Sequence, residues 1–190
     1  MPKRRRPDSS YHVYQLKVVL NDSKPTIWRR LQVPGNINLL DLHGVLQVVM
    51  GWTNKHLHSF LTATETYCLP SDDPDPYDMD ERQYTLEDIV FIEKESFLYE
   101  YDFGDGWSHE ILVEALLPFM GETQALCIGG KNACPPEDCG GISGYYEFLK
   151  IISTPNHVDH RRMLEWSGVP FDPKHFDIEK INAKLRVATL

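Results

Sequence analysis

The sequence has no long apolar run, little cysteine, and few basic residues relative to acidic ones. No apolar stretch comes near the about 20 residues that cross a bilayer, so no membrane-spanning helix is expected. Only four cysteines occur in 190 residues, too few for the disulfide framework of a small secreted protein. The first ten residues, MPKRRRPDSS, are basic and polar and contain no secretory apolar region. We therefore expect a soluble, cytoplasmic protein with reduced thiols.

The charge balance argues against a protein that grips nucleic acid. Residues 1–10 hold four of the 19 basic residues and one of the 28 acidic ones, so the rest carries 15 basic and 27 acidic residues. Such an acidic body repels phosphate backbones. The run Lys3 to Arg6 is short and lacks aromatic neighbours, which is typical of a solvated terminus. We predict a disordered basic tail over residues 1–10, and nucleic acid is only weakly suggested as a partner.

The apolar pattern predicts one domain over residues 11–190. With 42% hydrophobic residues, a chain of this length can bury a full core. Alternation predicts strands, and spacing of three and four with capping residues predicts helices. The predicted elements are strands over 12–20 and 27–33, a helix capped by Asn38 and stopped by Gly51, a strand over 56–66, a hairpin around Gly104 to Gly106, and helices beginning at Ser143, Pro155 and Asp177.

His56 and His58 fall on one face of the predicted strand over 56–66. Two histidines spaced by two residues point the same way, as metal ligands would. Since no third ligand stands nearby in the sequence, we expect them to be structural.

The register of the hairpin FLYEYDFGDGWSHEILVEALL decides whether it carries a catalytic pair. A two-residue turn at Asp105-Gly106 would set Asp102 opposite His109, a carboxylate and an imidazole suited to general base catalysis. A three-residue loop, Gly104 to Gly106, instead pairs Phe103 with Trp107.

The apolar match favours the three-residue loop. It pairs Tyr101 with His109 and produces one continuous aromatic and aliphatic face, whereas a one-residue slip would break that face. We therefore expect His109 at the mouth of an apolar face near Tyr101 and Trp107, with Asp102 and Asp105 at the turn.

The segment KNACPPEDCGG, residues 131–141, raises the question of a metal site. Structural zinc usually takes cysteine pairs two to four residues apart, and only Cys134 and Cys139 approach that spacing. A zinc site would need Cys127 together with His109 or Cys68 to complete the shell. We predict no cofactor, with zinc as the alternative, and expect the cysteines to be mainly packing residues.

The acidic residues of this segment also argue against a reactive thiol and against an anion-binding site. Glu137 and Asp138 stand beside Cys139, where they oppose a reactive low-pKa thiol. The same acids oppose an anion at the glycine-rich start of the following helix. A rigid loop would instead present Glu137 and Asp138 to a partner.

Several segments carry a family resemblance in chain order. They are YQLKVVL, IWRRLQVP, LLDLHGVLQVVMGW, HLHSF, YDFGDGWSHEI, ACPPEDCGGISGYYEF, HRRMLEW, and FDPKHFD with INAKL. From about Tyr11 to Leu185 the chain resembles the plasmid pRiA ORF-three-like family, some of whose members are labelled transposon-passenger resolvase-like proteins. The resemblance implies an α+β domain with a curved antiparallel sheet and packed helices, of the alpha-beta roll type. It also implies an association with mobile elements, but no established reaction.

These observations favour a binding module over an enzyme. In the favoured hypothesis a cleft between hairpin and loop binds a basic peptide or protein, or another cationic ligand. Its floor is Tyr101, Trp107 and His109, and its acidic rim is Asp102, Asp105, Glu137 and Asp138. The alternatives are an enzyme with His109 as general base beside Asp102 or Asp105, metal-assisted if the thiols hold a metal, and a DNA-transaction accessory protein.

Overall fold

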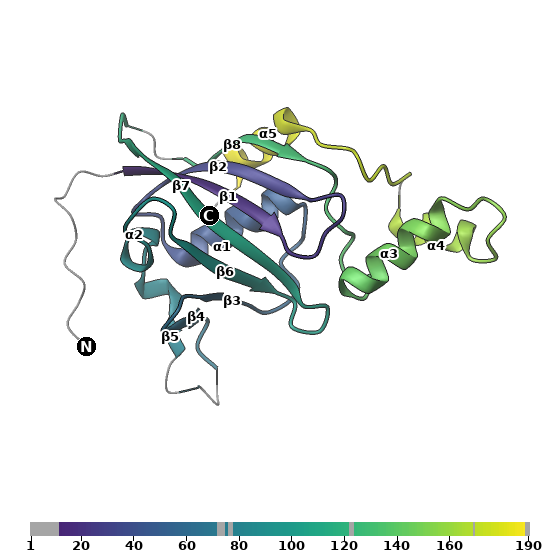
Figure 1. Cartoon of the computed structure of the whole chain (residues 1–190), viewed down its shortest axis with the longest axis horizontal. Helices are drawn as coiled ribbons and strands as arrows, with labels where there is room; N and C mark the ends of the chain where they lie inside the picture. The colour runs from purple at the N-terminus through teal and green to yellow at the C-terminus, as the bar shows by residue number, and fades with distance from the viewer. Residues whose placement is uncertain (1–11, 72–74, 76–77, 122–123, 169, 189–190) are drawn as a thin grey trace.

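One curved, open sheet of eight strands is the frame of the molecule (Figure 1). The computed structural model describes residues 12–71, 75, 78–121, 124–168 and 170–188. The strand order is β5-β4-β3-β6-β7-β1-β2-β8, and neighbours are antiparallel except β4 and β5, which are parallel. The predicted α+β fold with a curved sheet and packed helices is confirmed. The predicted basic tail lies outside the described residues.

The strands are β1 (His12–Leu20), β2 (Trp28–Pro34), β3 (His58–Leu61), β4 (Thr66–Cys68), β5 (Asp78–Asp80), β6 (Ser96–Tyr101), β7 (Trp107–Pro118) and β8 (Leu126–Lys131). The helices are α1 (Leu39–Met50), α2 (Leu86–Ile89), α3 (Gly141–Ile152), α4 (His160–Ser167) and α5 (Ile178–Val187), with a 3₁₀ turn η1 (Glu81–Gln83). Among the described residues, no helix is both long and apolar enough to cross a membrane.

The first hairpin forms one wall of the core. In β1 the alternating residues Leu16 and Val18 are buried, and in the antiparallel register they stand opposite Leu31 and Arg29 of β2. Because side chains alternate between the two faces, the apolar side chains of each strand lie on the face that packs into the core, as the sequence predicts. It also brings the charged Arg29 onto the buried face.

Helix α1 closes this core from behind the sheet (Figure 1). The Asn38 side chain accepts a hydrogen bond from the Leu40 backbone N–H at 2.9 Å, and Gly51 ends the helix with a φ of 85°. Both ends are as predicted, because a side-chain acceptor satisfies a free amide and glycine tolerates the left-handed region. The buried stripe of α1 includes Leu42, Val45 and Val49.

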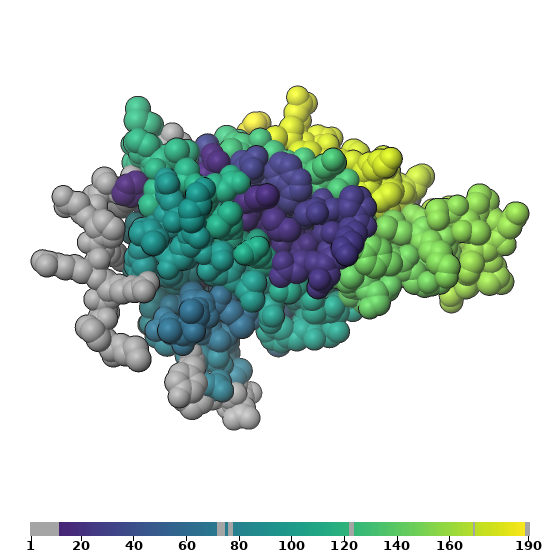
Figure 2. Space-filling view, viewed as in Figure 1, coloured from purple at the N-terminus to yellow at the C-terminus, as the bar shows by residue number. Residues whose placement is uncertain are grey.

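Helices α3 and α4 project from one end of the molecule (Figure 2), and α3 packs Tyr145 and Phe148 into the common core. The predicted start of α3 at Ser143 is wrong, because Gly140 caps the helix and Gly141 already begins it. The predicted helix start at Pro155 is also wrong. The His157 ring accepts a hydrogen bond from the Asp159 backbone N–H at 3.1 Å, so a turn precedes α4.

The predicted strand over 56–66 is shorter in the structure. Strand β3 ends at Leu61, and Thr62 then forms a tight turn in which its backbone N–H donates to the Glu65 carbonyl at 3.0 Å. The chain reverses there and continues as β4. The threonines and the alanine of this segment alternate weakly, so the pattern alone did not reveal the turn.

The core makes a first prediction. Leu16 is fully buried in the central strand β1, whereas Leu57 is 66% exposed. We expect Leu16→Ala to lower the free energy of unfolding by about 3 kcal/mol, through lost burial and a cavity. The control, Leu57→Ala, should change it by less than about 0.5 kcal/mol. Urea unfolding measures both, and equal losses would contradict the assigned core.

Candidate functional site

The turn between β6 and β7 is wider than the sequence predicts. Tyr101 pairs with Trp107 and Tyr99 with His109, which leaves a five-residue loop from Asp102 to Gly106. The predicted three-residue loop is therefore wrong by two residues. Because the shift is even, the same side chains still share one face.

The Asp102 side chain and backbone explain the wider turn. Its φ is 55°, its carbonyl accepts from the Gly106 N–H at 2.6 Å, and its Oδ1 accepts from the Gly104 N–H at 3.1 Å. A further N–H, from Asp105, lies 3.3 Å from the same oxygen. Aspartate tolerates the left-handed region and closes turns with its own side chain. Phe103, predicted to pair with Trp107, is consequently exposed.

His109 lies in the core and not at a cleft mouth. It is fully buried, and its Nδ1–H donates to the Tyr99 carbonyl at 3.2 Å. Its Nε2 has no hydrogen-bond partner among the described residues. Burial lowers the pKa of His109 to about 4. The pair of His109 with Asp102, which a two-residue turn would create, is not formed, because the register sets Tyr99 opposite His109.

The cysteines do not converge. Cys134 accepts a hydrogen bond from Arg29 Nη2 at 2.9 Å, while Cys127 donates to the Gly129 carbonyl at 3.5 Å. Burial raises the pKa of Cys134 to about 11, even though the Arg29 charge lowers it, and the pKa of Cys139 to about 12. Among the described residues, no three ligand atoms of the predicted zinc set (Cys127, Cys134, Cys139 and His109) lie within 4.8 Å of one another.

The thiol loop, residues 132–140, docks onto the turn through hydrogen bonds. Tyr101 Oη donates to Glu137 Oε1 at 2.6 Å, and the Thr53 hydroxyl donates to Glu137 Oε2 at 2.5 Å. The Gly140 N–H donates to Asp105 Oδ2 at 3.0 Å. Burial alone would raise the pKa of Glu137, but the hydrogen bonds from Thr53 and Tyr101 hold it below its ordinary value.

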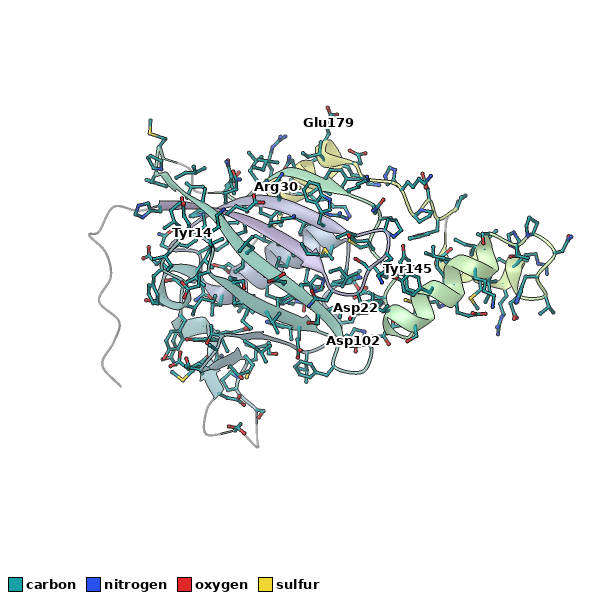
Figure 3. All side chains as sticks on the ribbon, in the orientation of Figure 1. Tyr14, Asp22, Arg30, Asp102, Tyr145 and Glu179 are labelled. Carbon is teal, nitrogen blue, oxygen red and sulfur yellow. The ribbon has the colours of Figure 1, made fainter. Side chains whose placement is uncertain are left out.

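Glycine is required where the loop meets the turn. A Cβ on Gly141 would lie 2.3 Å from the Asp105 carbonyl oxygen, and the φ of Gly141 is 66°. No other residue fits this approach without moving the backbone. Figure 3 places Asp102 at the same end of the sheet, beside the start of α3.

The docked loop completes a cluster of three side chains, here called the His56 cluster: His56, Asp102 and Asp138. His56 Nε2 lies 3.0 Å from Asp138 Oδ1 and 3.6 Å from Asp102 Oδ2. Within the part of the chain that the structure describes, this is the only group of three or more His, Cys, Asp or Glu side chains with ligand atoms all within 4.8 Å. The side chains of His56, Asp102 and Asp138 are 28%, 11% and 57% exposed.

One detail sets the His56 cluster apart from an ordinary ion pair. His56 Nε2 is shielded from solvent yet makes no hydrogen bond to a described residue, despite its distance of 3.0 Å from Asp138. Both carboxylates lie on left-handed backbone, with φ of 55° at Asp102 and 58° at Asp138, a region that aspartate tolerates in turns.

A buried polar network supports the segment that carries His56. The rings of His43 and His58 stack at 3.4 Å, and His58 Nε2 lies 2.9 Å from a buried Glu81 carboxylate. His43 also contacts the Tyr99 hydroxyl and the Asn54 side chain, each at 2.8 Å. Burial first, and then the charge of His58, lower the pKa of His43 to about 4. His58 is thus structural, as expected, and belongs to a different cluster from His56.

The structure gathers part of the predicted site. Tyr101, Asp102, Asp105, Glu137 and Asp138 meet where loop and turn dock. Trp107 and His109 lie below them in the core, each with its ring within 6 Å of the Trp52 ring.

Sequence reasoning missed the roles of Thr53 and His56. Thr53 supplies two donors to Glu137, and His56 joins two carboxylates. The available signal was the polar stretch TNKH, residues 53–56, which follows the helix stop at Gly51 after one intervening tryptophan, since loops on a rigid scaffold often carry binding residues.

Comparison with known proteins supplies a family and a fold. The family described as "Plasmid pRiA4b ORF-3-like protein" matches residues 12–180. The "Uncharacterized protein y4hQ" of Sinorhizobium fredii is 41% identical over 157 residues, which cover 82% of this chain and 81% of that protein. A crystal structure of a "Protein of Unknown Function", MM3350 from Methanosarcina mazei, is 35% identical with a TM-score of 0.82, covering 90% of this chain and 98% of its own.

The burial of His109 makes a prediction about pH. Its pKa is about 4 in the folded chain and near 6.5 when unfolded. Below pH 6.5 the unfolded chain binds a proton here that the folded chain does not, so stability falls as the pH drops from 6.5 to 4. Over this window His109 should contribute a loss of about 3 kcal/mol.

Urea unfolding at several pH values, for the natural chain and for His109→Gln, measures this loss. We expect the variant to lose less stability across the window, because one of the two low-pKa histidines is gone. If the natural chain and the variant lost equal stability across the window, His109 would take up its proton equally readily in the folded and the unfolded chain.

Proposed function

This chain belongs to the plasmid pRiA4b ORF-3-like family, and we propose that it is a binding module that accepts a positively charged ligand at the His56 cluster. The observation that carries the proposal is the convergence of one imidazole nitrogen and two carboxylates at the surface end of the hairpin. Two carboxylates beside a single imidazole favour a cation. The net charge of −9 adds a favourable long-range field for such a ligand.

The distances within the cluster favour a divalent metal ion as the ligand. Imidazole nitrogen and carboxylate oxygen bind zinc at about 2.0–2.2 Å, so neighbouring ligand atoms in a tetrahedral or octahedral shell stand about 2.8–3.6 Å apart. The separations of 3.0 and 3.6 Å from His56 Nε2 fall in that interval. The Asp138 side chain is 57% exposed, so an ion held there would also be open to water.

Glu137 has a different role in this proposal. Both of its carboxylate oxygens already accept hydrogen bonds, from Tyr101 and from Thr53. It fixes the loop that presents Asp138 and is a positioning residue, not a ligand.

A basic peptide is the second ligand that a specific observation favours. Leu57 and Phe103 are large apolar side chains that are 66% and 57% exposed, and the Asp102 N–H donates to the Leu57 carbonyl at 2.9 Å. Leu57 follows His56 in the chain, and Phe103 follows Asp102. A peptide with a lysine or arginine beside an apolar residue would match both features.

Titration calorimetry with MnCl₂ and ZnCl₂ tests the metal. We expect one ion per chain, and affinity that falls as the pH falls, because protons compete with a metal ion for its ligand atoms. Asp138→Asn and His56→Gln should each weaken binding at least about tenfold. The remote acid Glu179, at the opposite side of the molecule in Figure 3, provides the control Glu179→Gln, which should bind as the natural chain does.

The same variants separate the two ligands. If neither metal binds, but a short peptide containing lysine and leucine binds and loses affinity in Asp138→Asn, the peptide is the ligand. If the metals and the peptide bind the variants as tightly as the natural chain, the His56 cluster is not a binding site. The same conclusion follows if none of these ligands binds the natural chain.

A further inference from the structure

A second site rests on the buried guanidinium of Arg29. This side chain is only 3% exposed and lies on the inward face of β2. It donates to the carbonyls of Val49, Trp28 and Lys131 at 2.8–3.1 Å and to Cys134 Sγ at 2.9 Å. These bonds use four of its five N–H groups, so one Nη2–H is left over.

No carboxylate among the described residues neutralises this charge. Partial compensation comes from the Val49 carbonyl, which belongs to the last turn of α1, where the helix dipole is negative. The Phe176 ring also lies over the guanidinium at 4.9 Å. Partial charges and a ring face do not supply a full negative charge, and a buried unpaired charge is expensive.

A cavity of about 170 Å³ opens onto Arg29. Its walls come from the last turn of α1, the thiol loop and α5, and include Cys134, Phe176 and Ile181. At about 30 Å³ per water molecule this is the volume of roughly six waters, or of a small organic molecule. The side chains of Val48, Val49 and Met50 make one wall apolar.

Two further cations line the mouth of the cavity. Lys180 and Lys184 are one helical turn apart on α5, both exposed, and neither has an ion pair among the described residues. Like charges at this spacing repel each other. The one carboxylate of the lining, Asp177, is engaged as the N-cap of α5, where it accepts from the Lys180 backbone N–H at 2.9 Å.

The lining therefore carries three cationic side chains against one carboxylate, in a chain whose net charge is −9. A basic hollow in an acidic molecule concentrates small anions. We propose that this cavity binds a small carboxylic acid with a short apolar tail, its carboxylate near Arg29, Lys180 and Lys184 and its tail against Val48 and Met50.

Butyrate is a probe of matching size and chemistry. Titrated into the ¹⁵N-labelled full chain, it should shift the amide signals of residues 48–51, 133–134 and 175–184, with a dissociation constant on the order of millimolar or tighter. The uncharged analogue butyramide should bind at least about tenfold more weakly, because it lacks the charge that the cations recognise.

Variants at the mouth avoid disturbing the core. Lys180→Gln combined with Lys184→Gln should weaken butyrate binding about fivefold. Lys24→Gln combined with Lys150→Gln removes the same charge from exposed positions elsewhere and should leave binding unchanged.

Three results would overturn the proposal: butyramide binding as tightly as butyrate, phosphate binding where butyrate does not, or equal butyrate binding by the two double variants. The cavity and the His56 cluster share no residue, so either site can fail without the other.

Discussion

The docking of the thiol loop on the β6–β7 turn is the interaction on which the candidate site depends. Glu137 is its centre, because Tyr101 of the sheet and Thr53 of the segment after α1 both donate to one carboxylate. A charged acceptor with several donors is stronger than a neutral hydrogen bond and more directional than apolar contact. It therefore fixes three separate segments in one geometry. The His56 cluster exists only in that geometry, since His56, Asp102 and Asp138 come one from each of these segments.

The same loop separates opposite charges. Its first half carries Cys134, which faces Arg29, and its second half carries Asp138, which faces His56. Between them the Pro135 carbonyl accepts from the indole N–H of Trp52 at 3.0 Å, so the loop is held at its middle as well as at its end. A stiff spacer of this kind keeps a basic cavity and an acidic cluster apart within a few residues.

How much the sequence could predict depended on whether a feature was periodic or local. The spacing of apolar residues determines which side chains share a face. The inward-facing side chains of the β6–β7 hairpin were therefore predicted correctly, although the pairing register was not. The length of the turn depends on one side chain, Asp102, that bonds to its own backbone, and alternation cannot detect this. The position of His109 was also predicted only in part: its face was right, but the structure buries the ring completely and does not place it at the mouth of that face.

Arg29 is a charged residue at an inward position of an otherwise apolar strand face. Such a residue indicates a binding site more strongly than a cluster of exposed acids does. The stretch IWRRLQV places it between Ile27, Leu31 and Val33 on the inward side, and the structure buries it there. Exposed acids occur on any acidic protein because water solvates them. A cation at an inward strand position has no such support, so the fold must provide carbonyls, a ring, or a ligand to balance it. Here three carbonyls and the Cys134 sulfur accept from four of its five N–H groups. A bound carboxylate would accept from the remaining N–H and supply the missing negative charge.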